Sequence, residues 1–451
     1  MLAVAAASSA QQAVSPVTLT LPQAVANSLK NYPSIRVSQE QMNAAAAAIR
    51  SARTAYLPKA DALAQVNRAT RNNVFGLLLP QSVIPSMSGP VIGSNNLGTV
   101  WGSAVGVLVT WEPFDFGLRS ANVAVANAAR AQSEAALKRT QFDVAVAAAD
   151  AYLTLVAAQE AVRAAQAGVD RAEVVLRTIA AQVRAELRPG ADQSRAEAEL
   201  AAARTQWIQG QQAADIARVT LSQFTGTEPS RIEVRAGSLV QCPPAQTPPT
   251  PNTAGNPILL EQNAAVEQAR AQLRALERAY FPKFYLQGSA YARGTGAETN
   301  GERLGGLNGL APNFQNYALG LSVNFPILDL PALRAREAGE SATIRSEEAR
   351  SAQIAVDLRA QWNRAIATLE GARRVAANTP TQFSAARAAA QQATARYQAG
   401  LANIDEVAEA QRLLTQSEID DTLARLSVWR GLLGIATAAG DIQPFITEAA
   451  R

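Results

Sequence analysis

Few residues of this chain could carry out catalysis or bind a metal. Its 451 residues include no histidine, and Cys242 is the only cysteine. This composition excludes catalytic triads that depend on histidine, the usual zinc sites and intrachain disulfides. The sequence also shows no nucleophile beside a base and no pair of acids in a pocket-like pattern. We therefore predict neither an enzyme nor a bound cofactor or metal, and we assign Cys242 no role.

The charged residues are mixed and not clustered. The formal net charge is +4, which is small for this length, and Lys and Arg alternate with Asp and Glu along the helix-forming stretches. Proteins that bind nucleic acids concentrate basic residues in a patch or stripe. The sequence therefore predicts no nucleic-acid partner.

The overall composition favours long helices. Hydrophobic residues make up 48% of the chain and aromatic residues only 5%, a mixture that suits Ala-rich, closely packed helices. The chain has no uninterrupted run of eighteen apolar residues, so the sequence predicts no transmembrane helix. Any membrane span is expected to consist of strands.

The sequence contains an internal repeat. Residues Asn31 to Lys59 and Gly255 to Lys283 align without a gap, 224 positions apart. In both copies an Ala-rich, helix-forming run ends in Ala-Tyr, one apolar residue and Pro-Lys. Because proline stops a helix and restricts the residue before it, Pro58 and Pro282 are predicted to form helix-to-strand turns. We therefore expect two copies of one scaffold.

A very long helix is predicted between Gly117 and Leu187. This stretch has no proline, and Gly168 is its only internal glycine. About seventy residues would make a rod on the order of 100 Å long. Apolar residues recur in it at alternating spacings of four and three, as in a coiled-coil seam. They are Val144, Ala148, Ala151, Leu155, Ala158, Val162, Ala165, Val169, Ala172, Leu176, Ile179 and Val183.

The rod is expected to fold back on itself as a hairpin. Arg188-Pro189-Gly190 ends it, and a second helix is predicted from about Asp192 to Phe224. This returning helix has about half the length of the rod. The helix predicted from Pro33 to Tyr56 has the length needed to cover the remainder.

The second copy predicts the same hairpin. A rod is expected from Leu330 to Ala399, a turn at Gly400 and a returning helix from Asn403 to about Ala438. Pro380 lies inside the rod and predicts a kink or break. The apolar seam is weaker here, because polar residues replace apolar ones at Gln361, Thr368, Thr379 and Gln382.

Four segments alternate between apolar and small or polar residues, as strands do. They lie at about 59–68, 103–112, 283–293 and 316–326. Each has the length of a tilted strand that crosses a bilayer. Four strands cannot close a membrane barrel, and lipid does not tolerate exposed strand edges. The residues alone leave two alternatives: a soluble chain with ordinary strands, or several chains that donate strands to one barrel.

These elements divide the chain into five segments. Small apolar residues ending in Ser8-Ser9-Ala10 suggest the remnant of an export signal, with a flexible Ala-rich terminus as the alternative. A Pro-rich stretch separates the two repeats. The segments are the signal remnant 1–14, repeat 1 at 15–227 with its hairpin at about 115–226, the linker 228–255, repeat 2 at 256–440 with its hairpin at about 329–438, and the tail 441–451.

Taken together, these residues resemble the TolC family of outer-membrane efflux proteins across essentially the whole chain. The resemblance rests on the duplication, on the Ala-Tyr-Leu-Pro-Lys and Ala-Tyr-Phe-Pro-Lys motifs, on Trp-Glu-Pro-Phe-Asp-Phe-Gly at 111–117 and on Tyr-x-x-Gly at 397–400. It implies a mainly α protein with a membrane β-barrel. In such a homotrimer each chain gives two strands and a long helical hairpin per repeat, and a 12-stranded β-barrel continues into a periplasmic α-helical barrel.

The resemblance also implies a gate at the hairpin tips. In the family, acidic residues six and nine positions after the turn glycine face the lumen, and here these are Glu406 and Glu409. They lie three apart, on one helix face, and such carboxylates would attract cations. A family tyrosine that helps to latch the tip matches Tyr397. The latching arginine is replaced by Ala402 and a further acid by Ala196, so we expect a differently latched, looser entrance.

The turns at the tips resemble those that dock onto a periplasmic adaptor protein. Small residues there would allow close approach of two backbones, although an ordinary helix-hairpin turn also suits them. The docking residues are predicted to be Arg188, Pro189, Gly190, Ala191, Asp192, Gly400, Leu401, Ala402 and Asn403.

The function that the resemblance implies is a passive exit duct in the outer membrane of a Gram-negative bacterium, extending into the periplasm. It would serve a tripartite efflux or type I secretion system. Its partners would be two further copies of the chain, a periplasmic adaptor, an inner-membrane transporter reached through that adaptor, and outer-membrane lipid. The alternative from the residues is a trimeric structural or adhesive coiled-coil protein of the cell envelope. The cargo is not encoded in any feature of the sequence.

Overall fold

A computed structural model describes residues 17–70, 98–244, 253–298, 302–325 and 327–451. The predicted signal remnant lies outside these residues, as do most of the loop between the first two strands and part of the Pro-rich linker. The chain forms two compact units. Residues 1–41, 133–263 and 349–451 make up one, here called the hairpin unit, and residues 42–132 and 264–348 make up the other, the sheet unit.

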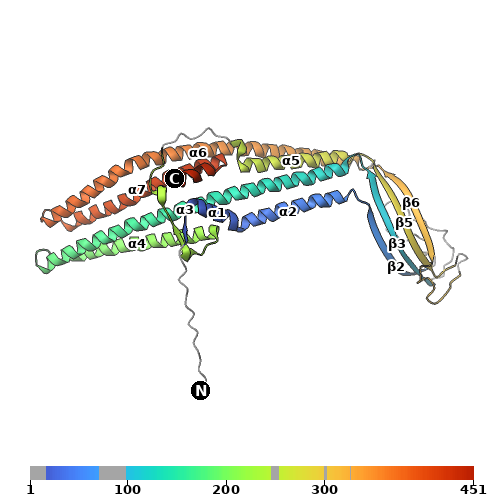
Figure 1. Ribbon diagram of the computed structural model, residues 1–451, viewed down its shortest axis with the longest axis horizontal. Helices are drawn as coiled ribbons and strands as arrows, with labels where there is room; N and C mark the ends of the chain where they lie inside the picture. Colours follow the sequence, from blue (N-terminus) through green and yellow to red (C-terminus); the bar gives the residue numbers. More distant parts are fainter. Residues whose placement is uncertain (1–16, 71–97, 245–252, 299–301, 326) are drawn as a thin grey trace, which may run out of the picture. The chain divides into compact units, whose positions relative to one another are not determined.

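The hairpin unit contains most of the two helical hairpins (Figure 1), and the first turns of their long helices belong to the sheet unit. Helices α3 (Leu118–Arg184) and α4 (Gly190–Thr225) form the first, and α6 (Leu330–Gln398) and α7 (Ile404–Ala439) form the second. All four helices begin and end within a few residues of the predicted positions. The break expected at Pro380 is wrong, since α6 continues through it. Pro380 is exposed, and Ala376 and Thr379 on the adjoining turn are buried against neighbouring helices, so packing holds the helix together around the missing amide.

Shorter helices meet the ends of the returning helices. These are α1 (Leu21–Asn31), α2 (Pro33–Thr54), α5 (Pro257–Arg278) and α8 (Gln443–Ala449). Asn31 donates from Nδ2 to the carbonyl oxygen of Thr225 at 2.8 Å, and Asn256 donates to that of Ala438 at 3.2 Å. Each asparagine thereby satisfies a carbonyl that the end of α4 or α7 leaves without a helical partner.

The largest core of the hairpin unit surrounds the middle of α3. Tyr152, Leu155 and Val156 are fully buried there and pack against Leu221 of α4 and Trp429 of α7. The tyrosine hydroxyl lies 3.0 Å from the carbonyl oxygen of Leu19 and 2.7 Å from that of Arg235. It therefore holds the two-stranded sheet of β1 (Val17–Leu19) and β4 (Ile232–Val234) against α3.

One helix among the described residues, α3, is long and apolar enough to pass a test for membrane-spanning helices. The search of the sequence for an uninterrupted apolar run did not find this helix, because its most apolar stretch of 18 residues includes charged residues. Of the residues in that stretch, 61% are buried inside the chain, as is typical of a core helix.

The sheet unit contains a four-stranded antiparallel sheet in the order β2-β3-β5-β6. The strands are β2 (Lys59–Thr70), β3 (Thr99–Phe114), β5 (Lys283–Thr295) and β6 (Phe314–Asn324), and they lie side by side in Figure 1. β2, β3 and β5 cover their predicted segments, and β6 begins and ends two residues before the predicted segment at 316–326. The two strands of different repeats, β3 and β5, pair in the centre, and β2 and β6 form the edges.

Candidate functional site

The candidate site is the pair of turns at the hairpin tips. Asn403 begins α7, and its side-chain oxygen accepts a hydrogen bond from the Glu406 amide at 3.0 Å. Asp405 and Glu406 lie in the first turn of this helix, where negative charge is favourable at the helix N-terminus. Gly400 adopts a left-handed conformation with φ of 78° and ends α6. Gly190 begins α4, and a Cβ added there would meet no neighbouring atom within 4 Å.

Tyr397 connects the two tips. Its hydroxyl donates to Oδ2 of Asp192 at 2.9 Å, and the residue is only 3% exposed. The guanidinium of Arg188 lies over the ring, 4.4 Å from its centroid, and donates to the Tyr397 carbonyl oxygen at 2.6 Å. Burial, together with the hydrogen bond to Asp192 and its charge, raises the pKa of Tyr397 to about 12. The phenol thus keeps its proton and remains a donor near neutral pH.

An arginine does contact Tyr397, although not the one expected from the sequence. The arginine expected after the turn glycine is replaced by Ala402, but Arg188 of the other hairpin reaches Tyr397 instead. Both Arg188 and Asp192 were predicted as docking residues. Both side chains contact Tyr397 within the chain.

A small apolar cluster lies beneath this latch. It contains Ile179 of α3, Ala196 of α4, Tyr397 of α6 and Ile404 and Val407 of α7. Ala196 occupies the position at which the family resemblance would place an acid. In this chain it is 3% exposed and packs in the cluster, so the tips are held by apolar contacts as well as by polar ones.

The two predicted gate acids are exposed and are both paired with arginines. The Glu406 carboxylate lies 3.9 Å from Nη1 of Arg396, and that of Glu409 lies 2.9 Å from Nη2 of Arg412. The side chain of Glu409 is 75% exposed. An arginine therefore lies beside each carboxylate: the 409/412 spacing is a helical pair visible in the sequence, whereas Arg396 reaches Glu406 across the turn.

Arg412 also belongs to a longer alternation of charges, here called the charge ladder. From Arg412 it continues to Glu199 of α4 at 3.7 Å, from Glu199 to Arg195 at 3.2 Å, and from Arg195 to Asp405 of α7 at 3.2 Å. With Glu409 it comprises three acids and two arginines that join α4 to α7. The spacings 195/199 and 409/412 give helical pairs, but the contacts across the helices depend on their register and leave no signal in the sequence.

The other predicted docking residues lie at the surface. Leu401 and Asn403 belong to the turn of the second hairpin, and Pro189, Gly190 and Ala191 to that of the first. Leu187 and Leu401 expose 74% and 70% of their surfaces. An apolar side chain therefore projects from each turn.

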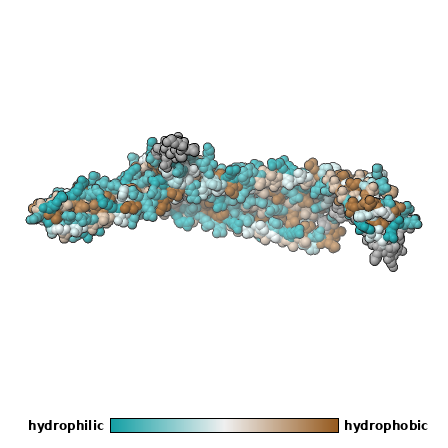
Figure 2. Space-filling model, turned by 90° about the horizontal axis from the view of Figure 1, so that it is seen from below, coloured by the Kyte–Doolittle hydropathy of each residue, from teal (hydrophilic) through white to brown (hydrophobic). Residues whose placement is uncertain are grey.

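In the sheet unit, Pro58 directly precedes β2 and Pro282 directly precedes β5. The faces of the sheet differ in polarity. One face carries exposed apolar side chains, and Figure 2 shows hydrophobic residues gathered near the strands. They include Val105, Val107, Val109 and Trp111 of β3 and Tyr317, Leu319, Leu321 and Val323 of β6.

The opposite face of the sheet is polar. Thr110 of β3 pairs with Gln287 of β5, and Tyr285 pairs with Ser322 of β6. Alternating faces of this kind are typical of strands with lipid on one side and water on the other.

The sequence profile of the outer membrane efflux protein family matches residues 24–227 and 253–441, which is most of the chain. The chain belongs to this family. No curated protein matches the sequence.

Solved structures agree in fold with this member of the efflux family. A membrane protein from Pseudomonas aeruginosa is similar with 20% identity, 94% of this chain and 93% of that chain covered, and a TM-score of 0.76. The open state of the MtrE outer membrane channel of Neisseria gonorrhoeae shares 19% identity over 93% and 89%, with a TM-score of 0.72. The CmeC outer membrane channel of Campylobacter jejuni shares 15% over 96% and 89%, with a TM-score of 0.73.

Family membership confirms the central predictions from the sequence. The chain is an outer-membrane exit duct for efflux in a Gram-negative bacterium, reaching into the periplasm, and its fold combines membrane strands with a long α-helical part. The family is one of channels and not of enzymes. The alternative of an adhesive coiled-coil protein is therefore set aside.

Proposed function

We propose that three copies of this chain form the duct, each giving four strands to a 12-stranded β-barrel and two hairpins to a periplasmic α-helical barrel. The four-stranded sheet supports this most directly. Its edge strands β2 and β6 each pair with one neighbour among the described strands, and its apolar face is exposed. Lipid does not tolerate free strand edges, so β6 of one copy is expected to pair with β2 of the next.

The hairpin tips form the gate of this duct. Tyr397, Asp192 and Arg188 latch the hairpins together in the closed state, with the apolar cluster around Ile179 beneath them. Glu406 and Glu409 contribute carboxylates to the aperture. Arginines pair with both acids, so the aperture is a mixed ring of charges. Counted with the charge ladder, the tips carry four acids and three arginines (Glu199, Asp405, Glu406 and Glu409 with Arg195, Arg396 and Arg412), a small acidic excess. We therefore expect weak cation selectivity. A ring of unpaired acids would be more strongly selective.

The exposed turns dock onto a periplasmic adaptor. Leu187 and Leu401 project from the two turns, and the neighbouring small residues Gly190, Ala191 and Gly400 leave space for another backbone. Through this adaptor the duct works with an inner-membrane transporter, which supplies the energy. The chain itself contributes no catalysis and binds no cofactor. Opening is a shift between two packings of the hairpins.

Single-channel currents in planar bilayers test the proposed gate. We expect small, cation-selective openings from the wild type and a loss of selectivity in Glu406→Gln/Glu409→Gln. Asp215→Asn is the matched control, because Asp215 is an exposed acid paired three residues away with Arg218 of the same helix, as Glu409 is with Arg412.

The results separate the duct from its gate. Conductance that the double substitution leaves unchanged would keep the duct but reject these two acids as gate residues. A folded, membrane-inserted protein that never conducts would contradict the proposed duct itself.

A further inference from the structure

The returning helix of the second hairpin is unusual between its tip and its core. Its apolar residues join the tip cluster at Ile404 and Val407 and the upper cores from Ala424 onward. Between these positions Ala408 and Leu414 are buried but belong to none of these clusters, whereas the polar residues Thr415, Ser417 and Asp421 are buried as well. The apolar packing that would fix α7 is thus interrupted by polar side chains over this stretch.

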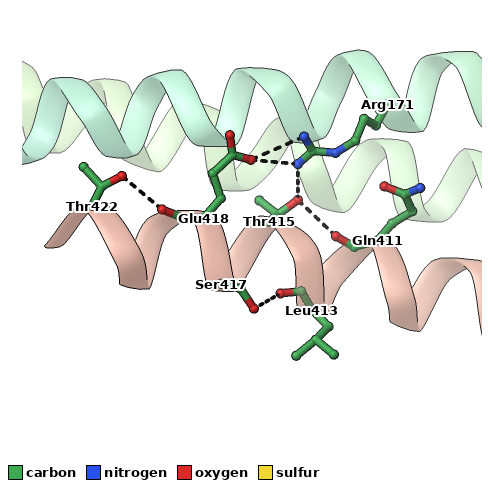
Figure 3. A network of polar contacts seen from close by, with 7 residues as sticks. All are labelled: Arg171, Gln411, Leu413, Thr415, Ser417, Glu418 and Thr422. Atoms are coloured by element: carbon green, nitrogen blue, oxygen red, sulfur yellow. Dashed lines mark hydrogen bonds and ion pairs between the residues drawn. The ribbon is translucent and has the colours of Figure 1, made fainter. Parts of the chain in front are cut away.

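Hydroxyl groups loosen the helix in the same stretch. Thr415 donates to the carbonyl oxygen of Gln411 at 3.1 Å, Ser417 to that of Leu413 at 2.7 Å and Thr422 to that of Glu418 at 3.1 Å. Figure 3 shows these three bonds. Each hydroxyl competes with a backbone amide for its carbonyl, and bonds of this type weaken and bend helices. Ser427 and Thr437 make the same bonds beside the apolar cores, so the stretch 411–422 differs in combining these bonds with buried polar side chains, and this combination makes it the compliant part of α7.

A clamp from α3 grips this compliant stretch. Arg171 donates from Nη2 to Oγ1 of Thr415 at 2.9 Å, and both of its terminal nitrogens lie 3.3 Å from Oε2 of Glu418 (Figure 3). One turn earlier, Gly168 brings the α3 backbone so close that an added Cβ would lie 3.0 Å from the same Thr415 oxygen. At this point the backbone of α3 contacts a side chain of α7, and the Arg171 guanidinium links the two helices by charge-assisted hydrogen bonds.

Open space lies on both sides of the clamp. A cavity of about 430 Å³ extends between α3, α4 and α7 and is lined by Ala165, Ala172, Ala203 and Ala408 among others. A second cavity of about 570 Å³ lies between α3, α6 and α7, beside Arg171, Arg387, Gln391 and Leu414. Gln411 borders both. Its Oε1, like Nε of Arg171, is buried without a hydrogen-bond partner among the described residues. Beside the clamp, α7 is therefore less tightly held than at the clamp itself.

We infer that residues 411–422 of α7 are a hinge, that Gly168 and Arg171 hold its pivot against α3, and that the tip of α7 swings about this pivot when the gate opens. This inference rests on the proposed function of the tips. It makes Arg171 a positioning residue, which acts on the gate through α7 and does not itself touch the cargo. Close contact at one point fixes the axis, and the cavities give the helix room to turn about it.

Stiffening the hinge is the first test. Ser417→Ala/Thr422→Ala removes two hydroxyls that compete for backbone carbonyls and raises helix propensity. We expect the open probability in planar bilayers to fall about fivefold, the effect of about 1 kcal/mol. The matched control is Ser427→Ala/Thr437→Ala, which removes the same type of bond from α7 above the hinge and is expected to leave the open probability unchanged.

Fixing the pivot covalently is the second test. The Cβ added at Gly168 would lie 3.7 Å from the Thr415 Cβ, which suits a disulfide. In Cys242→Ser, which removes the chain's only cysteine, Gly168→Cys/Thr415→Cys can be oxidised to pin the helices at this point. A true pivot stays in contact, so the oxidised and reduced forms are expected to open alike.

Arg171 itself is tested by graded substitution. Arg171→Gln removes the clamp and is expected to destabilise the position of the gate acids, broadening the distribution of conductance levels. Arg171→Lys keeps the ion pair with Glu418 but not the simultaneous bond to Thr415, so it is expected to restore part of the wild-type distribution. Circular dichroism and thermal melting check that each variant is folded.

The outcomes separate the hinge from the duct. Closure on oxidation would show that α3 and α7 part at Gly168 and would overturn the pivot. Equal open probabilities for the two hydroxyl-deletion pairs would overturn the hinge. Tyr397→Phe, which loosens the tip without touching the hinge, is expected to open more often than the wild type. If neither it nor the wild type conducts, the proposed duct fails, and the hinge fails with it.

Discussion

The two hairpins share one architecture but differ in what fills them. Apolar residues such as Tyr152, Leu155 and Val156 fill the middle of α3. They belong to one core with residues of α1, α4, α7 and α8. The corresponding helices of the second hairpin bury Thr379, Thr415 and Asp421. A fully satisfied polar network fixes one arrangement, but Nε of Arg171 and Oε1 of Gln411 in this network are buried without a hydrogen-bond partner among the described residues. On the hinge inferred above, the first hairpin is the frame and the second the moving part.

The tips continue this division. The first hairpin supplies the residues that receive the latch, Arg188 and Asp192, and the second supplies Tyr397 together with Glu406 and Glu409. If the proposed gate holds, the two hairpins of a duplicated scaffold differ in role through their side chains, while their helix lengths are nearly the same.

The strongest test of the comparison removes a carboxylate from each hairpin. Asp421 is buried, accepts a hydrogen bond from Thr379 at 2.8 Å and pairs with Arg425. Asp421→Ala leaves Thr379 and Arg425 without their shared carboxylate. We expect it to lower the free energy of unfolding by about 2–3 kcal/mol, less than for a fully buried pair because Arg425 is partly exposed. Asp150 of α3 is exposed and pairs with Arg430 at 3.6 Å. Asp150→Ala is expected to cost about 0.5 kcal/mol or less.

Denaturant unfolding of the detergent-solubilised protein measures both. Equal losses for the two variants would contradict the view that buried polar contacts organise only the second hairpin.

The starts of the two rods give a second contrast. Asp115 accepts hydrogen bonds from the amides of Gly117 and Arg119 and pairs with the Arg119 guanidinium at 2.9 Å. Burial alone would raise the pKa of this carboxyl, but these bonds outweigh it and hold the pKa below its usual value. At Asp329, its counterpart in the second repeat, the described part of the chain supplies only the backbone bond from Leu333. Asp115→Asn is expected to cost about 1–2 kcal/mol and Asp329→Asn about 0.5 kcal/mol or less.

The pH dependence of this difference follows from the lowered pKa. The stability that Asp115 contributes is present above the unfolded pKa, near 3.8, and is lost as the pH falls through the lower folded value. Melting temperatures of the wild type and Asp115→Asn are therefore expected to differ at pH 7 and to converge in strong acid. A constant gap down to the lowest pH would mean that the carboxylate charge is not what stabilises the start of α3.

Much of this architecture could be predicted because it depends on local patterns. Heptad spacing, prolines and turn glycines located all four long helices, and alternation located the four strands. The contacts that hold the tips could not be predicted, because they depend on the register between helices far apart in sequence. Arg188 reaches Tyr397 and Arg195 reaches Asp405 only once that register is set. The break predicted at Pro380 was wrong because tertiary packing outweighed a local signal.

The latch is expected to be insensitive to pH over the ordinary range. Tyr397→Phe removes the bond to Asp192 and is expected to raise the open probability about fivefold, the effect of about 1 kcal/mol. The folded pKa of Tyr397 is raised to about 12, so its contribution is fully present below the unfolded value, near 10, and is lost as the pH rises toward 12. Single-channel recordings at pH 6 and pH 9 should therefore show the same ratio between variant and wild type.

A ratio that collapses between those pH values would show that a group other than the Tyr397 phenol controls the latch.

The smallest effect is expected from the charge ladder, because its members are largely exposed. Arg412 contacts both Glu409 and Glu199, and its side chain is 57% exposed. Exposed ion pairs contribute about 0.2–1 kcal/mol and are screened by salt. Arg412→Gln is therefore expected to raise the open probability about twofold at low ionic strength and hardly at all near 1 M salt.

The same substitution bears on the comparison of the two hairpins, because the ladder joins them. Freed from Arg412, Glu409 becomes an unpaired carboxylate, so cation selectivity should increase while the latch at Tyr397 is unchanged. Arg204→Gln is the control: Arg204 of α4 pairs with Glu173 of α3 at 2.8 Å and is 55% exposed, but both partners belong to the first hairpin. If Arg204→Gln alters gating as much as Arg412→Gln does, surface charge in general and not the link between the hairpins governs the opening.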